Sequence, residues 1–291
     1  YENLFLPVMD GTFDGNGHQI IGVTLSEEMS DYGLFRYITE NGVVKNLTVE
    51  GEILGGDEQE NIGILAGSNA GAIENCVTRG TLNAETAVGG IAGKNEETGS
   101  VSRSENEAAI DGKMQTGGIA GLNEGSISDC VNSGKINTNQ KIKKQAEGDG
   151  SSVNISIPNA VTGLTADERA NETGGIAGNS SGDISYCTNT ATIGFERLGS
   201  STGGIVGRQL GSLSYCANKG VVYGHKNVGG ISGVLEPYEE SSYDRDYRQE
   251  LSDELDRLGD LIDDVSNQGE KLGDNLSDNA DLLSDQLVHQ S

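Results

Sequence analysis

The sequence is poor in several residue types that enzymes of its size normally use. Its 291 residues include no Trp, three Pro and only 4% aromatic residues. A large globular core usually contains more aromatic side chains than this. Basic residues are also scarce, since 19 Lys and Arg stand against 45 acidic residues and the net charge is −26. Such a charge argues against nucleic acid or an anionic membrane as a partner.

Long apolar runs are missing as well. No stretch of about 18 apolar residues occurs, so the sequence predicts no membrane insertion through a helix. The chain opens on a short apolar stretch, residues 1–8, with no basic segment before it. We therefore expect a fragment of a longer protein, with its export signal outside this sequence.

Glycine, in contrast, is abundant, with 44 residues. Without a collagen period or many prolines, this abundance indicates tight corners at regular intervals. Ile, Val and Leu are spread evenly through the first 235 residues, which disfavours disorder. These two patterns together suggest a repeat.

A unit of roughly 28 residues recurs along the chain. Its first element is Gly-Gly-Ile-Ala-Gly or a variant of it, and the glycines before the Ile or Leu are Gly33, Gly63, Gly90, Gly118, Gly175, Gly204 and Gly230. Their spacings are 30, 27, 28, 57, 29 and 26 residues, so one interval is doubled. The second element is Gly-x-Ile-x-x-Cys, and the third is a small residue followed by an aliphatic one, as in Gly134-Lys-Ile136. Each unit thus has three short apolar-centred runs, all too short for a helix.

Stacking these units buries their aliphatic residues in three continuous ladders. The ladders predicted are Ile64, Ile91, Ile119, Ile176, Ile205 and Ile231; Ile73, Val101, Ile127, Ile184 and Leu213; and Ile53, Leu82, Ile110, Ile136, Ile193 and Val222. The sequence therefore predicts an all-β solenoid over 1–235, a parallel, right-handed β-helix with three short strands per turn. About seven or eight turns at a strand spacing of ~4.8 Å would be roughly 35 Å tall. A leucine-rich repeat has a similar period, but its L-x-x-L-x-L-x-x-N signature is absent.

The repeat resembles a known family. Gly-Gly-Ile-Ala-Gly-x-Asn-x-Gly-x-Ile-x-x-Cys is similar to the GLUG repeat of bacterial surface and secreted proteins. The opening segment from Phe13 to Ile20, with Gly33-Leu-Phe35 and Gly42-Val-Val44, looks like the first coils that precede such repeats. The resemblance covers about Asp10 to Val234. It implies export and a binding role, as in parts of adhesins and in the non-catalytic region of IgA-cleaving metalloproteases, but names no ligand.

The four cysteines occupy one equivalent place, 12 or 13 residues after their anchor glycines. They are Cys76, Cys130, Cys187 and Cys216, and Leu47 and Ser104 hold that place in other units. A place that accepts Leu, Ser or Cys indicates an inward core position, so a buried thiol ladder is the favoured interpretation. A disulfide between Cys187 and Cys216 is the alternative. A zinc site is disfavoured because no Cys-x-x-Cys occurs.

Other candidates for chemistry are scattered. His18, His225 and His289 form no metal-binding pattern, and no His-Glu-x-x-His is present. Asp10, Asp14 and Asp57 could serve a polysaccharide-cleaving site only if two of them lay about 5–9 Å apart in a groove. Asp14-Gly-Asn-Gly is more typical of a tight turn. We expect no catalytic residue, no metal and no cofactor.

A further column follows two residues after each cysteine position. It contains Val49, Thr78, Asn106, Asn132, Asn189 and Asn218. Stacked amides can bond to one another between coils, as in other ordered β stacks. We interpret this column as structural.

The doubled interval marks an insertion at about 138–172. It contains Lys141, Lys143 and Lys144, and a short alternating run that includes Asn154. Insertions in solenoids lie at the surface and often carry binding, so these four residues are the candidate binding loop. The alternative is an additional, degenerate coil.

After a hinge at 236–242, the pattern changes to heptads. Apolar residues recur at spacings of four and three, at Leu251, Leu255, Leu258, Ile262, Val265, Leu272, Leu276 and Leu283. This predicts an α-helical coiled-coil segment over 243–291. From Glu239 onward there are 16 acidic and 4 basic residues, so this segment is strongly acidic. Such a helix needs a partner and could mediate self-association, or it could lie against the solenoid.

The sequence as a whole predicts a binding or display module and not an enzyme. The expected function is adhesion or display outside the cell or on the cell wall, with a host protein or a glycan as the partner. A polysaccharide-acting β-helix enzyme is the alternative from a different class. A third reading is a structural spacer within a larger secreted protease.

Overall fold

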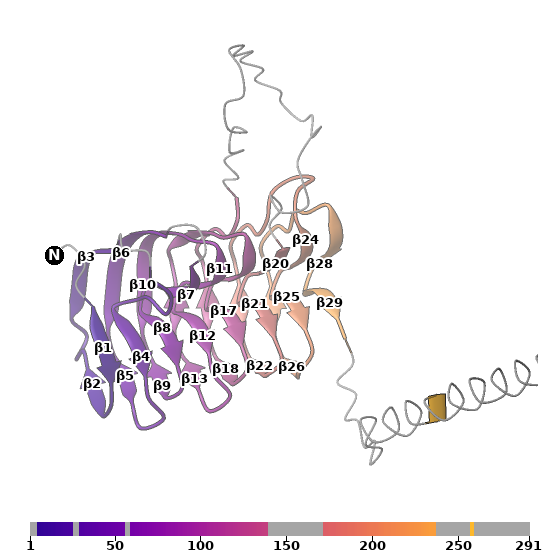
Figure 1. The fold of residues 1–291 in the computed structure, drawn as a ribbon. Coiled ribbons are helices and arrows are strands. Elements are labelled where there is room, and N and C mark those ends of the chain that lie inside the picture. Colours follow the sequence, from indigo (N-terminus) through magenta and orange to yellow (C-terminus); the bar gives the residue numbers. More distant parts are fainter. Residues whose placement is uncertain (1–4, 26–28, 56–58, 139–170, 237–256, 259–291) are drawn as a thin grey trace, which may run out of the picture. The chain divides into compact units, whose positions relative to one another are not determined.

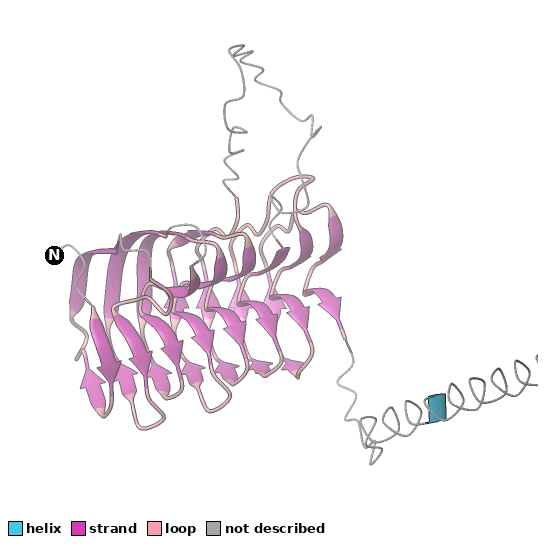
Figure 2. Cartoon of the chain, viewed as in Figure 1, coloured by secondary structure: helices cyan, strands magenta, loops and turns pink. Residues whose placement is uncertain are grey.

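The computed structural model describes residues 5–25, 29–55, 59–138, 171–236 and 257–258. The chain divides into two compact units, Tyr1–Tyr238 and Glu239–Ser291. The described residues of the first unit are short strands joined by short loops (Figure 1 and Figure 2). They wind as a solenoid, in which each strand pairs with the equivalent strand of the coils before and after it.

Four parallel sheets, and not three, run along the described part of the solenoid. We number them in the order in which each coil passes through them. Sheet I contains β7 (Glu60–Gly63), β11 (Thr86–Gly89), β16 (Met114–Gly117), β20 (Asn171–Gly174), β24 (Ser200–Gly203) and β28 (Lys226–Gly229). Sheet II contains β1 (Leu6–Met9), β4 (Phe35–Ile38), β8 (Ala66–Asn69), β12 (Ala92–Asn95), β17 (Ala120–Asn123), β21 (Ala177–Ser180), β25 (Val206–Gln209) and β29 (Ser232–Leu235).

The other two sheets complete each coil. Sheet III contains β2 (Thr12–Asp14), β5 (Val43–Lys45), β9 (Ala72–Glu74), β13 (Ser100–Ser102), β18 (Ser126–Ser128), β22 (Asp183–Ser185) and β26 (Leu213–Ser214). Sheet IV contains β3 (Gln19–Leu25), β6 (Thr48–Leu54), β10 (Val77–Asn83), β14 (Glu105–Asn106), β15 (Ala109–Asp111), β19 (Val131–Asn132), β23 (Thr188–Asn189) and β27 (Ala217–Asn218). The parallel β-helix is thus confirmed, whereas three strands per turn is wrong.

The additional strand comes from the segment before each Gly-Gly. That segment forms sheet I, and the Ile of Gly-Gly-Ile-Ala-Gly lies in the bend between sheets I and II. Its backbone N–H bonds to the equivalent Ile of the next coil, as from Ile119 N to Ile176 O at 2.9 Å. The inward column of sheet I contains three Thr among its aliphatic residues, so the sequence did not reveal it as a core column. Its members are Ile62, Val88, Thr116, Thr173, Thr202 and Val228.

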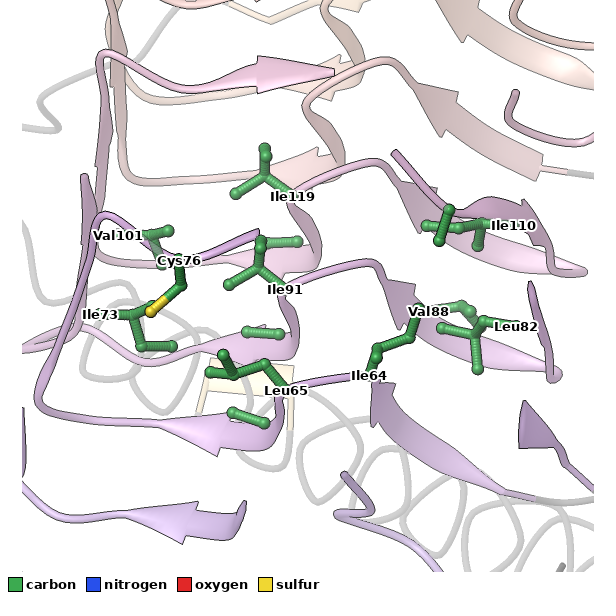
Figure 3. Close-up of a cluster of buried hydrophobic side chains, with 14 of the residues drawn as sticks. Ile64, Leu65, Ile73, Cys76, Leu82, Val88, Ile91, Val101, Ile110 and Ile119 are labelled. Carbon is green, nitrogen blue, oxygen red and sulfur yellow. The ribbon is translucent and has the colours of Figure 1, made fainter. Parts of the chain in front are cut away.

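The three predicted aliphatic ladders are present, and Figure 3 shows part of them in the core. Their last members are less buried, since Leu213 and Val222 are half-buried and Ile231 is 40% exposed. Ile73, Val101 and Ile127 pair directly across sheet III and are at most 1% exposed. Leu82 pairs with Ile53 on one side and Ile110 on the other. Stacked aliphatic residues therefore fill the interior with few aromatic rings, which explains the low aromatic content.

Two columns of left-handed residues make the corners, and most of them are not glycine. One column lies within sheet I and contains Asn61, Ala87, Gln115, Glu172, Ser201 and Asn227, with φ between 51° and 59°. The other joins sheet III to sheet IV and contains Asn46, Asn75, Arg103, Asp129, Tyr186 and Tyr215, with φ between 48° and 55°. The expectation that glycines make the regular corners is therefore wrong for these columns.

The glycines of the Gly-Gly pair serve close packing instead. A Cβ on Gly118 would lie 2.3 Å from the Oδ1 of Asn132 and 2.3 Å from the carbonyl oxygen of Gly175. The same clash recurs at Gly90, Gly175 and Gly204. At Gly230, in the last described coil, nothing lies within 4 Å, because none of the described coils stacks on that end.

The insertion interrupts the chain but not the stack. β16 pairs directly with β20, β17 with β21, β18 with β22 and β19 with β23. The coils on either side of residues 139–170 are therefore immediate neighbours, which excludes a degenerate coil between them. The boundary also moves, since Asn171 and Glu172 belong to β20.

The predicted acidic coiled coil lies almost entirely outside the described residues. Only Arg257 and Leu258 are described there, as helical and exposed. The hinge at 236–242 is described only at Glu236.

Candidate binding surface

The predicted binding loop lies outside the described residues. Lys141, Lys143, Lys144 and Asn154 all belong to the range 139–170. The structure places only the two ends of this segment, at Thr138 after sheet IV and at Asn171 in sheet I. The hydroxyl of Ser200 bonds to the side chain of Asn171, which ties the second end to the following coil.

The cysteines occupy equivalent places just inside the corner between sheets III and IV. Cys76, Cys130 and Cys187 are buried, Cys216 is half-buried, and all four thiols are free. Ser104 shares the column, and its hydroxyl accepts a hydrogen bond from the Cys76 backbone N–H at 3.1 Å. The structure shows no disulfide between Cys187 and Cys216; the Cys187 N–H lies 3.4 Å from the Cys216 sulfur.

The pKa values of Cys76, Cys187 and Cys216 are raised, so these three thiols are protonated at neutral pH. Burial raises the pKa of Cys76 to about 11. Hydrogen bonding to Cys130 raises the pKa of Cys187 to about 12, and hydrogen bonding to Cys187 also raises the pKa of Cys216. Because the thiolate is the nucleophile and the metal ligand, thiols held in this state are poor at either task.

The candidate carboxylates act locally in the first coils. The Asp10 carboxylate accepts a hydrogen bond from the Thr39 hydroxyl at 2.6 Å. Asp14 accepts from the Asn46 side-chain amide and from the backbone N–H of Asn16, both at 2.9 Å. These bonds lower the pKa of Asp14, with the Asn46 amide as the largest cause. Asp57 lies outside the described residues.

Asx-turn bonding at Asp14, with positive φ at Asn16 and Gly17, is the geometry predicted from Asp14-Gly-Asn-Gly. His18 and His225 are exposed, and His289 lies outside the described residues. In the described ranges, no group of three or more His, Cys, Asp or Glu residues is placed to hold a metal ion.

Two amide columns run through the solenoid, one predicted and one not. In the predicted column, Asn106 donates to Asn132, Asn132 to Asn189 and Asn189 to Asn218, at 2.7 to 2.8 Å. A second column follows sheet II, where Asn69 donates to Asn95 and Asn95 to Asn123, both at 2.8 Å. Both columns also bond to backbone carbonyls at the corners, so these buried polar groups are satisfied and structural.

Over the last four strands of sheet III, the outer face carries mostly small hydroxyl side chains. Ile127 and its equivalents point into the core, so the residues on either side of them point outward. The outward residues of β13, β18, β22 and β26 are Ser100, Ser102, Ser126, Ser128, Asp183, Ser185 and Ser214, and they are paired in register. The hydroxyl of Ser212, just before β26, bonds to the Asp183 carboxylate. We call this set the serine face.

Two exposed tyrosines stand at the edge of the serine face. Tyr186 and Tyr215 directly follow Ser185 and Ser214, at the corner where sheet III passes to sheet IV. Their rings are stacked, with centroids 4.9 Å apart and an interplanar angle of 7°. Tyr186 is 58% exposed and Tyr215 is 77% exposed. They are the largest side chains in their corner column.

Both tyrosines have left-handed backbone, with φ of 55° and 53°. That conformation costs a non-glycine residue roughly 1–2 kcal/mol, and Asn and Asp tolerate it better than a bulky residue does. Asn46 and Asn75 occupy the same corner in earlier coils. Stacking of the two rings stabilises the fold by about 0.5–1.5 kcal/mol, which does not exceed this cost. Fold stability therefore gives no clear reason to prefer tyrosine at these two corners.

Sequence reasoning missed this pair although a signal was available. Tyr186 and Tyr215 each immediately precede a cysteine of the repeat, in consecutive units. The alignment that stacked Cys187 on Cys216 therefore also stacks the two tyrosines. What the sequence could not show is their exposure.

Comparisons with known proteins agree with the repeat. The family model described as the GLUG motif matches residues 112–137. This match confirms the predicted GLUG repeat in that coil, and the neighbouring coils pair in register with it. The chain is also 32% identical over 85 residues to Halomucin from Haloquadratum walsbyi. That match covers 29% of this chain and 1% of Halomucin, and no solved structure matches significantly.

No helix among the described residues is both long and apolar enough to cross a bilayer.

Proposed function

We propose that this chain is an adhesion and display module of a cell-surface or secreted protein, with no catalysis of its own. The observation that carries the proposal is the GLUG repeat, together with the similarity to Halomucin. These two comparisons suggest a surface-associated repeat protein. Binding would use the exposed faces of the solenoid or the insertion at 139–170.

The roles of the reactive side chains support a binding module over an enzyme. Cys76, Cys130 and Cys187 belong to the core ladder, and Asp14 is an acceptor within its turn. The outer faces, by contrast, repeat from coil to coil and are joined by parallel hydrogen bonding. A repeated, rigid face is suited to presenting the same contacts many times along one axis.

The test is a binding screen with the full chain. The purified protein would be applied to an array of oligosaccharides and to a panel of extracellular proteins, with and without residues 139–170. We expect saturable binding to at least one of them. Reducing-sugar release from polysaccharides is assayed in parallel, and its detection would favour the enzyme alternative. The absence of any saturable binding would contradict the adhesion function.

Localisation has its own test. Antibody against the chain should label intact cells of the source organism, or should detect the protein in the culture medium. Detection only after the cells are lysed would contradict surface display.

A further inference from the structure

We propose that the stacked pair Tyr186–Tyr215, together with the adjoining serine face, is a binding site for a neutral saccharide. This inference rests on the proposed adhesion function and gives it a site and a ligand class. The pair lies on described, regularly paired coils, and the proposed site includes no residue of the range 139–170.

The first argument is exposure of aromatic surface in an ordered place. Tyr186 and Tyr215 are among the most exposed large side chains of the described solenoid, and each ring keeps one face that the stack does not cover. Exposed tyrosine offers a rigid, amphipathic contact area, because its ring is apolar and its hydroxyl forms hydrogen bonds. The corner backbone and the stack hold both rings in one orientation before any ligand arrives.

The second argument is the chemistry beside the rings. A pyranose ring presents C–H groups on its faces and hydroxyl groups around its edge. The rings of Tyr186 and Tyr215 can contact the C–H face. Ser185, Ser214 and the Asp183–Ser212 pair supply donors and acceptors for the hydroxyl edge, within two or three residues of the tyrosines along the chain. An apolar protein ligand would leave these polar groups without partners.

The third argument concerns the charge of the ligand. The corner residue below Tyr186 is Asp129, and Asp183 lies on the serine face. The strands β18, β22 and β26 contain no Lys or Arg. A sulfated or uronic-acid sugar would meet the carboxylates of Asp129 and Asp183, and these three strands provide no cation to balance them, so a neutral sugar is the better fit.

Equivalent residues in other coils indicate which substitutions would remove the two tyrosine rings and preserve the backbone conformation of the corner. Tyr186→Asn and Tyr215→Asn place at these corners the residue that Asn46 and Asn75 already provide in the same left-handed conformation. The double variant should therefore fold. The matched control is Arg103→Asn, a substitution in the same column but outside the tyrosine stack.

The experiment uses the full chain and an array of neutral and acidic oligosaccharides, followed by titration of the best neutral binder. Because the protein contains no Trp, its emission comes from its nine tyrosines, and a change that the double variant loses is assigned to Tyr186 and Tyr215. We expect binding of a neutral oligosaccharide with a change in tyrosine emission. The double variant should bind at least 10-fold more weakly, and Arg103→Asn should bind like the wild type.

A second arm separates this inference from the adhesion function. The same proteins are applied to a mucin-coated surface and to that surface after enzymatic removal of its glycans. Binding that survives glycan removal, or that the double variant retains, overturns the saccharide site while leaving adhesion intact. Binding by no probe on the array also overturns the site. A wild-type protein that binds neither the array, the mucin nor the protein panel contradicts the adhesion function as well.

Discussion

The side-chain amide of Asn106 donates a hydrogen bond to the Oδ1 of Asn132 at 2.8 Å, between coils that lie 26 residues apart in the chain. Asn132 donates in turn to Asn189, which is 57 residues away because the insertion lies between them. The amide column therefore keeps its spacing across the insertion. Asn106, Asn132 and Asn189 are fully buried, so these groups have no access to water.

Replacing Asn132 by Ala should destabilise the solenoid strongly. The change leaves the Asn106 donor, the Asn189 acceptor and the Gly134 carbonyl with fewer partners in a buried place. Each unsatisfied buried group costs about 1–3 kcal/mol, so we expect a loss on the order of 3 kcal/mol in the free energy of unfolding. Urea denaturation measures it. Asn218→Ala, at the half-buried end of the column, should decrease the free energy of unfolding by clearly less. Equal decreases for the two variants would show that burial does not set the contribution of each amide.

The Gly-Gly pairs make a second prediction, with a control in the same motif. Gly118→Ala should destabilise the protein by about 2–3 kcal/mol or more, because the new Cβ would lie 2.3 Å from Gly175 O and Asn132 Oδ1. Gly230→Ala, at the same repeat position, should be neutral or slightly stabilising, since nothing lies within 4 Å of its Cβ. Thermal unfolding of both variants tests this. If Gly230→Ala is as harmful as Gly118→Ala, then the last described coil is covered in the native protein.

The repeat made much of the fold predictable, because residues that are equivalent in the aligned units lie next to each other in the stacked coils. Once Ile127 was placed over Ile184, the neighbouring thiol and amide columns followed at fixed offsets from it. Sheet I was missed for a physical reason. Its inward column contains Thr116 and Thr173 as well as Val88, all of them buried. In the sequence, this mixture of polar and apolar residues is as typical of a loop as of a core strand.

The candidate site was less predictable than the fold. The sequence directed attention to the insertion and its lysines, which lie outside the described residues. The exposed tyrosines belong to the regular repeat, at a corner where other coils carry Asn, Arg or Asp. Periodicity identifies which residues share a column. It does not show whether a corner side chain points into solvent, because that depends on the left-handed backbone of the corner.

The buried thiols predict a loss of stability at alkaline pH. The pKa of Cys76 rises from 9.0 to about 11 in the folded chain, so above pH 9 the unfolded state releases a proton that the folded state retains. The stabilisation is therefore complete below pH 9 and is lost as the pH rises toward 11. For each such thiol the slope is about 1.4 kcal/mol per pH unit, as an order of magnitude.

A serine variant isolates this effect from other alkaline titrations. Ser104 already occupies the column, so Cys76→Ser and Cys187→Ser insert a residue that the corner accommodates. Urea unfolding of the wild type and the double variant is compared at pH 7, 9 and 10.5. The difference between their free energies of unfolding should be smaller at pH 10.5 than at pH 7. If this difference does not change with pH, then burial does not raise the pKa values of the thiols as the structure indicates.

The insertion should be dispensable for folding, because the coils around it are already paired. Three residues separate Leu82 of sheet IV from Thr86 of sheet I, and the equivalent connection after Ile136 begins with Asn137 and Thr138. Replacing residues 139–170 by Gly-Gly therefore gives a connection of ordinary length. We expect the free energy of unfolding to change by no more than about 1 kcal/mol, because long surface insertions cost little in loop closure. Circular dichroism and urea unfolding measure the result, and a control deletion of Ser126–Ser128 should abolish cooperative unfolding. A large decrease in the free energy of unfolding on replacing 139–170 would mean that this segment packs on the solenoid and helps to stabilise it.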